Sequence, residues 1–539
     1  MELFRTKSVE QALAETTTGD RKLVRNLGAW DLAVMGVAVA VGAGIFSIGA
    51  QAAAFHAGPA AIISFLIAGV ICGAAVMCYA EFASMIPAAG SAYTFTYTTV
   101  GEVVAWVIGW DLILEMLMAG SVVSKYWSVY LNDFLRLMGF NSSTEVHLGW
   151  FTFDWAPLIV VAFFTILLVL GTKIGARVDG AFTILKIGIV VFVVIVGFFY
   201  IKPSNYTPFV PPSEPASKVL GPASGGVMTQ PLLQWVTGQK PTVYGVSGII
   251  SGAALVFFSF LGFDVVATAS EEAKNPKRNV PLGIGIGMLM VIVMYMLVAV
   301  VTTGMVSYKD LAKAKDPSLA TGFELAGATW AAKIISFAIV IGLTTVVMVL
   351  LLGLTRVVFA MSRDGLLPRG LSKVGRHGTP AKLQIAVGVL VAIVSSCFNV
   401  SILADMVNIG TLSAFTLVAI SVPIMRRKRP DLPRSFKIPG SPWVPILIAV
   451  ANFWLMLNLT VLTWIRFVVW LLIGFCVYFG YSYRHSLLGT GQLDADMEKA
   501  MEEKADTQKA DVQKADAQKG EENLDLAGLT EENTESRRA

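Results

Sequence analysis

Charged residues are scarce in this chain of 539 residues: only 14% are Asp, Glu, Lys or Arg, whereas 55% are hydrophobic. A soluble protein carries about 25% charged residues, so this chain has too little polar surface to fold in water. The deficit excludes a soluble enzyme and a nucleic-acid-binding protein, and it predicts no nucleic-acid partner. Because a membrane-spanning helix needs about 20 apolar residues, the chain could supply on the order of a dozen spans.

Cysteine and histidine are also rare, with four residues of each. All four cysteines lie inside apolar runs without metal-ligand spacing, so we interpret them as packing residues and exclude a disulfide-stapled secreted protein. The histidines have no metal-ligand partner at a useful spacing. The sequence therefore predicts no metal and no cofactor, and its apolar runs lack the nucleophile–base pair that a membrane enzyme would need.

Long apolar stretches are what the sequence does contain, and twelve of them are long enough to cross a bilayer. They lie near residues 30–52, 58–83, 99–122, 156–172, 178–201, 247–270, 280–304, 331–361, 382–400, 402–425, 442–463 and 465–484. The connections at 401 and 464 are nearly absent, which leaves those two boundaries open. The pattern predicts an all-α polytopic membrane protein with a helical domain at 29–484.

Basic residues gather in the loops on the side of the N-terminus, with five in residues 363–382 and six in residues 426–437. This asymmetry predicts a multi-pass protein of the cell membrane with both termini in the cytoplasm. We interpret residues 1–28 as a cytoplasmic segment, with a short helix against the membrane as one option.

The C-terminal tail, placed at 485–539, has an acidic repeat. From about Gly491 it holds seven basic and fourteen acidic residues, so its net charge is −7 and that of the remaining chain is +11. Five-residue units begin at Lys504, Lys509 and Lys514. Five residues advance a helix by about 140°, so no apolar stripe can persist. We interpret the tail as disordered and cytoplasmic.

Glycines interrupt the first and sixth apolar stretches near their middle, at Gly42 and Gly44 and again at Gly262. Lipid tolerates irregular backbone only where it is buried in protein or lines a cavity, so these glycines favour broken helices. Close helix packing is the alternative for either cluster alone. Asp264 is suited to cap a half-helix that begins after Gly262.

The two interrupted stretches are five spans apart, which favours two inverted repeats of five spans each, at about 30–201 and 247–425, with extra helices at about 442–484. Half-helix N-termini present free amides and a positive dipole end to an anion, while the carbonyls that end the preceding half-helices can accept from a cation. Zwitterionic amino acids carry both groups. The pattern therefore predicts an amino acid site at the breaks.

A series of motifs runs through roughly residues 1–440. It includes Leu27-Gly28-Ala29-Trp30-Asp31, Gly42-Ala43-Gly44-Ile45-Phe46, Gly109-Trp110-Asp111-Leu112, Gly262-Phe263-Asp264 and Met361-Ser362-Arg363-Asp364-Gly365. Together these motifs resemble the cationic amino acid transporter family of the amino acid–polyamine–organocation superfamily. The resemblance implies the LeuT-like 5+5 inverted-repeat fold, with helices 1 and 6 broken, and twelve spans resemble the bacterial branch.

The resemblance also implies which residues hold the substrate. Backbone amides of Gly42, Ala43 and Gly44 would bind the α-carboxylate, and carbonyls near Val41 and from Phe258 to Leu261 would receive the α-amino group. Phe258 and Phe260 would close over the ligand, with ordinary helix packing as their alternative. The full expected set is Val41, Gly42, Ala43, Gly44, Ile45, Glu115, Phe258, Ser259, Phe260, Leu261 and Thr344.

Ionisable residues inside a span cost about 2.5–3.5 kcal/mol each, so each needs a reason. Glu115 lies in the third span and either orients the substrate amine or forms a structural pair. Asp111, one turn earlier, departs from the asparagine that the family often has, and receives no role. In family members that resemble this chain, a lysine fills the cation place of sodium-coupled relatives. Lys186 matches that lysine and is expected to couple transport to protons, with a permanently charged brace as the alternative.

These observations predict a secondary active transporter that works by alternating access, and no enzyme. We expect proton-coupled uptake of L-amino acids, either cationic ones such as arginine and lysine or small neutral ones such as alanine. An amino acid or polyamine exchanger and a non-transporting amino acid sensor remain alternatives. The expected partners are the substrate, protons and the lipid bilayer, and a small membrane subunit is left open.

Overall fold

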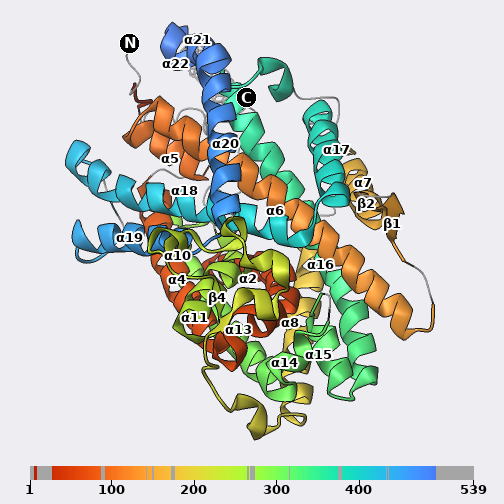
Figure 1. The fold of residues 1–539 in the computed structure, drawn as a ribbon. Helices are drawn as coiled ribbons and strands as arrows, with labels where there is room; N and C mark the ends of the chain where they lie inside the picture. The colour runs from red at the N-terminus through yellow and green to blue at the C-terminus, as the bar shows by residue number, and fades with distance from the viewer. Residues whose placement is uncertain are drawn as a thin grey trace, which may run out of the picture.

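The protein is a bundle of long helices in the computed structural model (Figure 1). The structure describes residues 5–8, 27–85, 91–140, 143–148, 151–170, 176–263, 266, 273–314, 316–373, 379–432, 434 and 436–492. Six of the described helical segments are long and apolar enough to cross a membrane, and six more apolar helices are shorter. This confirms an all-α polytopic architecture.

The described helices overlap all twelve predicted spans. In the first half they are α2 Ala29–Ala40, the helical segment made of η1 Gly44–Ile48, α3 Gly49–Ala52 and η2 Ala53–Ala57, then α4 Ala61–Met85, α6 Glu102–Leu137, α7 Ala156–Val169 and α8 Ala176–Phe198. In the second half they are α11 Gly245–Val256 with η7 Phe257–Phe260, then α13 Pro276–Met305, α16 Thr329–Arg363, α17 Ala381–Cys397 and α18 Val400–Lys428. Two further helices follow, α19 Trp443–Leu457 and α20 Val461–Val477.

Shorter elements connect these helices. They include α5 Ser91–Thr99, α9 Ala216–Val219, α10 Leu232–Val236, α14 Tyr308–Leu311, α15 Leu319–Leu325, α21 Tyr483–His485 and α22 Leu487–Thr490. Strands β1 Glu145–Leu148 and β2 Phe151–Asp154 form an antiparallel pair, and so do β3 Glu214–Pro215 and β4 Thr242–Val243.

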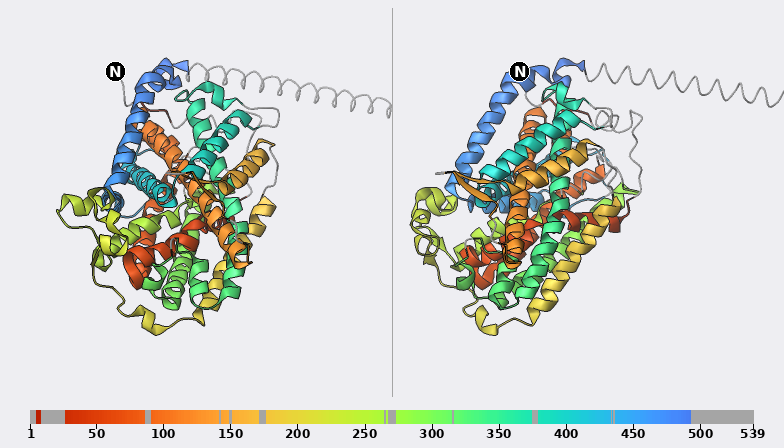
Figure 2. Two further views of the ribbon diagram at one scale, coloured as in Figure 1. Left: turned by 45° about the vertical axis from the view of Figure 1, so that its right-hand side comes forward. Right: turned by 90° about the vertical axis from the view of Figure 1, so that its right-hand side faces the viewer.

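The core of the bundle forms where helices far apart in sequence pack together. Helices α6 and α16 pack along each other, which the two turned views also show (Figure 2). Helix α13 packs on both α2 and α4, and α18 packs on α6. The centre of the bundle therefore brings the broken first helix next to elements from the second half of the chain.

Two boundaries differ from the sequence prediction. The turn between the last two long helices was expected at 464, but α19 ends at Leu457 and α20 begins at Val461. The side chain of Thr460 accepts a hydrogen bond from Thr463 N and so caps α20. Helix α6 continues to Leu137, fifteen residues beyond the expected end of the third span at 122. Near its last turn Arg136 donates to both carboxylate oxygens of Glu324, at 2.8 and 2.7 Å.

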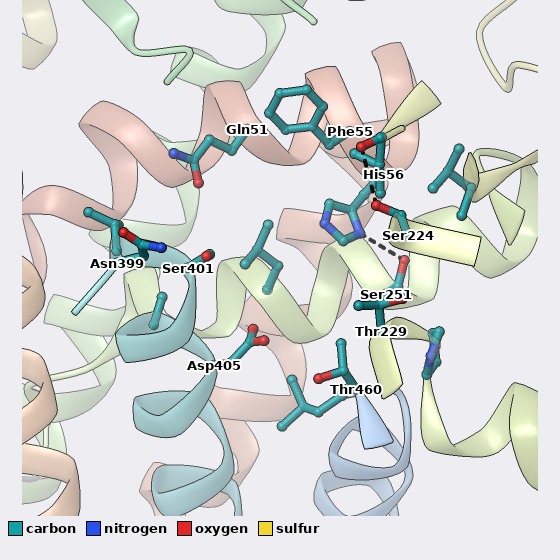
Figure 3. A pocket seen from close by; sticks show the side chains of 18 of the residues that line it. Gln51, Phe55, His56, Ser224, Thr229, Ser251, Asn399, Ser401, Asp405 and Thr460 are labelled. Carbon is teal, nitrogen blue, oxygen red and sulfur yellow. Dashed lines mark hydrogen bonds between the residues drawn. The ribbon is translucent and has the colours of Figure 1, made fainter. Parts of the chain in front are cut away.

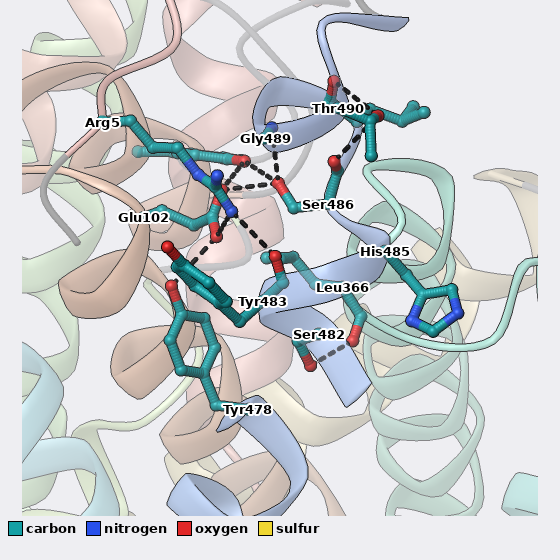
Figure 4. A network of polar contacts seen from close by, with 12 residues as sticks. Arg5, Glu102, Leu366, Tyr478, Ser482, Tyr483, His485, Ser486, Gly489 and Thr490 are labelled. Atoms are coloured by element: carbon teal, nitrogen blue, oxygen red, sulfur yellow. Dashed lines mark hydrogen bonds and ion pairs between the residues drawn. The ribbon is translucent and has the colours of Figure 1, made fainter. Parts of the chain in front are cut away.

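The described part of the N-terminal segment, residues 5–8, forms no helix and packs against the bundle. Arg5 donates twice to the fully buried Glu102, both at 2.8 Å, and this ion pair raises the pKa of Arg5. Glu102 also accepts from Tyr97, Tyr478 and Ser486 (Figure 4). Arg5 is thereby held against the start of α6 and the last helical turns.

Candidate substrate-binding site

The first helix is broken where the glycines predict it. Helix α2 ends at Ala40, and Val41 leaves the helical conformation with ψ 85°. The chain returns to helical angles at Ala43 and continues as a helical segment from Gly44 to Ala57. The first amides of a helix have no partner within it, so this second half starts with donors that point into the break.

The sixth helix is broken in a corresponding way. Helix α11 tightens into the short 3-10 turn η7 and ends at Phe260, and Leu261 is extended with ψ 147°. Gly262 follows with φ +110°, a conformation that L side chains rarely adopt. A Cβ at this position would also lie 2.9 Å from Cβ of Val39, so glycine is required both by conformation and by space.

The two breaks lie against each other. A Cβ added to Gly44 would lie 2.6 Å from Oγ and 2.7 Å from Cβ of Ser259, and closer still to its Cα. The buried hydroxyl Oγ of Ser259 has no hydrogen-bond partner among the described residues. The backbones of the two broken helices therefore meet directly, with a polar group at their contact.

A tyrosine from a third helix joins the breaks. The hydroxyl of Tyr295, on α13, lies within hydrogen-bond distance of Ala40 O and 2.7 Å from Ser259 O, and it can donate to either carbonyl. These carbonyls belong to the ends of the two half-helices, where the acceptors lack partners within the helix. Sequence reasoning missed this residue, although a tyrosine in the middle of an apolar run is the signal that could have found it.

A small cavity of about 20 Å³ lies at the breaks. It has room for about one water molecule. Its lining is Val39, Ala40, Gly42, Ala43, Gly44, Ala119, Val123, Phe258, Leu261, Val346 and Leu350. Five residues of the expected set are thus brought together around one space. No charged side chain is among these lining residues, all of which the structure describes.

The other expected residues lie around this cavity without lining it. Val41 and Ile45 are buried in the break and in the first turn after it. The ring of Phe260 packs against Tyr295, with centroids 5.1 Å apart. Glu115 is buried on α6, one turn before Ala119, and Thr344 on α16 donates to its own helix at Ile341 O. Asp264, the expected helix cap, lies outside the described residues.

Lys186 reaches the first break from α8. Its side chain is buried, and Nζ donates to Ala38 O at 2.8 Å, near the C-terminal end of α2. A cation there is favoured because the C-terminal end of a helix is the negative end of its dipole. An added Cβ at Gly342 would lie 3.2 Å from Cγ of Lys186, so α16 packs closely against the lysine stem. The lysine thereby connects α8 to the end of the first half-helix.

Asp111 forms a separate polar contact. Its side chain is fully buried in α6 and accepts a hydrogen bond of 2.7 Å from Ser413 on α18. Asp111 therefore helps join the two helices.

Comparison with known proteins identifies the fold family. A profile described as amino acid permease matches residues 27–483. The chain belongs to the amino acid permease family. This confirms the resemblance to the amino acid–polyamine–organocation superfamily, and the family consists of transport proteins and not enzymes.

Among the relatives of this permease, a "Branched-chain amino acid permease BcaP" from Bacillus subtilis is 41% identical over 494 residues, covering 90% of this chain and 99% of the relative. A "Methylthioribose transporter" from the same organism is 38% identical with the same coverage. A vacuolar "Cationic amino acid transporter 4" from Arabidopsis thaliana is 34% identical, covering 80% of this chain and 68% of the relative. Amino acid transport by a multi-pass membrane protein therefore follows from the family, whereas the relatives' names differ in substrate.

Proposed function

We propose that this permease takes up neutral aliphatic amino acids by alternating access between two inverted repeats. The observation that carries the proposal is the pair of breaks that meet at Gly44 and Ser259 beside a cavity with apolar walls. The α-carboxylate binds the amides that open the second half of helix 1. The α-ammonium binds the half-helix carbonyls and the hydroxyl of Ser259.

The walls of the small cavity support a neutral side chain. The cavity has room for about one water molecule, so the breaks must separate to admit a substrate, and Val123, Phe258, Val346 and Leu350 would then offer dispersion contacts to its aliphatic group. A buried guanidinium or ammonium would need a paired carboxylate, and none is among the described lining residues. Of the two substrate classes left open by the sequence, the neutral class fits these walls better. The name of the branched-chain relative points in the same direction.

Proton coupling through Lys186 forms the second part of the proposal. Its ammonium group is directed at the end of α2, two residues before Ala40 and three before Val41, where the break begins. Loss of its proton would remove a charge from the negative end of a half-helix and weaken the bond to Ala38 O. The protonation state of one lysine is thereby linked to the geometry of the break.

Uptake into liposomes tests the proposal. The purified full-length protein is reconstituted, and radiolabelled L-leucine, L-alanine and L-arginine are compared with and without an inward proton gradient. We expect saturable leucine uptake that the gradient increases, and arginine uptake lower by on the order of tenfold or more because its charge is unpaired. Preferred uptake of arginine would contradict the neutral substrate class.

Counterflow in the same liposomes separates a carrier from a sensor. Unlabelled leucine is loaded inside, and labelled leucine is supplied outside without any gradient. A carrier accumulates label transiently, whereas a sensor moves none. Flux that requires internal leucine would support the exchanger that the sequence left as an alternative.

A further inference from the structure

A second cavity, far larger than the first, lies at the end of the bundle opposite the N-terminal segment. Its volume is about 520 Å³, within the range of about 300–1,000 Å³ that is typical of small-molecule sites. Figure 3 shows side chains that converge on it from the second half of helix 1, from α11, from α18 and from the loop between α8 and α11.

The loop between α8 and α11 forms one wall and is fixed in place. Leu232 N donates to Leu459 O at 2.9 Å, and Val461 N donates to Gln230 O at 3.0 Å. These bonds attach the loop to the turn between α19 and α20. Helices α19 and α20, which follow the ten helices of the two expected repeats, therefore hold this wall in place through backbone hydrogen bonds.

One carboxylate in the cavity is available to a ligand. Asp405 is half-buried, points into the cavity (Figure 3), and accepts a bond of 3.2 Å from Thr463. In the described part of the chain it forms no salt bridge within 4 Å, although Arg466 lies close enough to interact with it electrostatically. By contrast, Lys125, the cationic side chain in the lining, is 2.8 Å from Asp154 and already neutralised.

The lining also contains the carboxylates of Glu145 and Asp316, which have interactions of their own, and it combines apolar with neutral hydrogen-bonding groups. Phe55, Leu255 and Val400 offer an apolar surface, whereas Asn399 and Ser401 supply an amide and a hydroxyl. A zwitterion with an aliphatic side chain needs these three kinds of contact: an anion for its ammonium, donors for its carboxylate and an apolar face. An isolated inorganic cation would not use the apolar part.

The large cavity lies on the same two broken helices as the small one. Gln51 lines the large cavity and Gly44 the small one, and seven residues of helix correspond to about 10 Å. On the sixth helix Leu255 lines the large cavity and Phe258 the small one, one helical turn apart. A ligand in the large cavity would therefore lie about 10 Å from the breaks along helix 1.

We propose that the large cavity is a second amino acid site, in which Asp405 binds the α-ammonium group of the substrate before it reaches the breaks. The inference rests on the proposed function for the identity of the substrate. It assigns substrate binding to Asp405. It also assigns to α19 and α20 the role of holding the loop that forms one wall of the cavity.

Protection from thiol labelling tests the site without any need for transport. Ser401→Cys places a reporter in the lining, in full-length protein with Cys397→Ala and Cys476→Ala, and a thiol reagent is added with increasing L-leucine or 3-methylbutylamine. We expect both compounds to slow labelling. Asp405→Asn should raise the half-protecting concentration by about tenfold or more because a charge-assisted bond is lost. The matched control Asp310→Asn, an exposed side chain on α14 outside the cavity, should leave the half-protecting concentration unchanged.

Two outcomes would overturn the proposal: labelling of the reporter protein that neither compound slows, or protection of the reporter protein that is equal with and without Asp405→Asn. Val400→Phe narrows the cavity without touching the carboxylate and should weaken protection as well, which covers the case in which Asp405→Asn fails to fold. 4-Methylpentanoate, which lacks the amine, should protect far less than the amine does.

Transport kinetics separate this inference from the proposed function. In liposomes Asp405→Asn should raise the leucine concentration at half-maximal uptake and leave the maximal rate nearly unchanged. If leucine is not transported at all, yet 3-methylbutylamine protects in an Asp405-dependent way, the proposed function fails and the ammonium site stands. If the wild-type protein and Asp405→Asn transport leucine with equal kinetics, the proposed function stands and the ammonium site at Asp405 fails.

Discussion

The contact between the two broken helices at Gly44 leads to a prediction that the geometry makes quantitative. Gly44→Ala would place a methyl group 2.6–2.7 Å from side-chain atoms of Ser259 and closer to its Cα, where ordinary contacts are 3.4–4 Å. A backbone atom cannot rotate away, so the helices must separate by about 1 Å to bring this Cα to ordinary contact distance. Overpacking of this kind costs about 1–3 kcal/mol. We therefore expect the apparent leucine affinity to fall by about 5- to 150-fold.

The assay is leucine uptake in liposomes at several concentrations, with the thermal unfolding midpoint measured on the same preparations. Gly285→Ala in α13 is the matched control, because a Cβ there meets nothing within 4 Å. It should leave uptake unchanged and stabilise its helix by up to about 1 kcal/mol. Wild-type affinity and an unchanged midpoint in Gly44→Ala would refute the direct contact between the breaks.

Three further predictions concern polar groups that hold the helices. Lys186→Ala should abolish proton-driven accumulation of leucine. Lys186→Arg should keep the positive charge and downhill leucine uptake but lose the pH dependence of uptake. Undiminished pH-driven uptake in Lys186→Ala would exclude proton coupling through this lysine. Tyr295→Phe removes the one donor shared by two buried carbonyls and should cost about 1–3 kcal/mol in thermal unfolding, more than the control Tyr206→Phe at a half-exposed site. Glu102→Gln removes the partner of Arg5 and should cost about 3 kcal/mol. Glu324→Gln, in a more exposed pair, should cost less than about 1 kcal/mol, and equal losses would argue against the buried network.

The breaks were accessible to sequence reasoning because their causes are local. Either glycine cluster alone could serve close helix packing, but two clusters five spans apart favour breaks, and Gly262 indeed takes a positive φ. The end of the third span was less accessible. Helix α6 runs on to Leu137, and its extension is packed against the rest of the bundle: Ser128 and Tyr130 are buried in it, and Arg136 pairs with Glu324, a residue 188 positions away in the chain. Hydropathy reports where apolar residues stop but not where a helix stops.

The partners of the broken ends could not be read from the sequence. Tyr295 stands out as a hydroxyl in an apolar run, but only the packing of α13 on α2 places this hydroxyl between Ala40 and Ser259. Lys186 was identified because a charge in a span is costly, yet its acceptor, Ala38 O, follows from the position of α8 beside α2. Asp405 was not singled out, since it lies only five residues after the start of α18.

The sequence by itself determined that this protein spans a membrane, where its helices lie and where two of them break, because hydrophobic run length, charge scarcity and glycine position act within one segment. Only the tertiary structure decided which helices and side chains contact one another. It brought the breaks into contact, joined their carbonyls through one tyrosine, and enclosed a large cavity between helix 1, α11, α18 and a loop fixed by α19 and α20. Such juxtapositions depend on the packing of segments hundreds of residues apart, which no local pattern encodes.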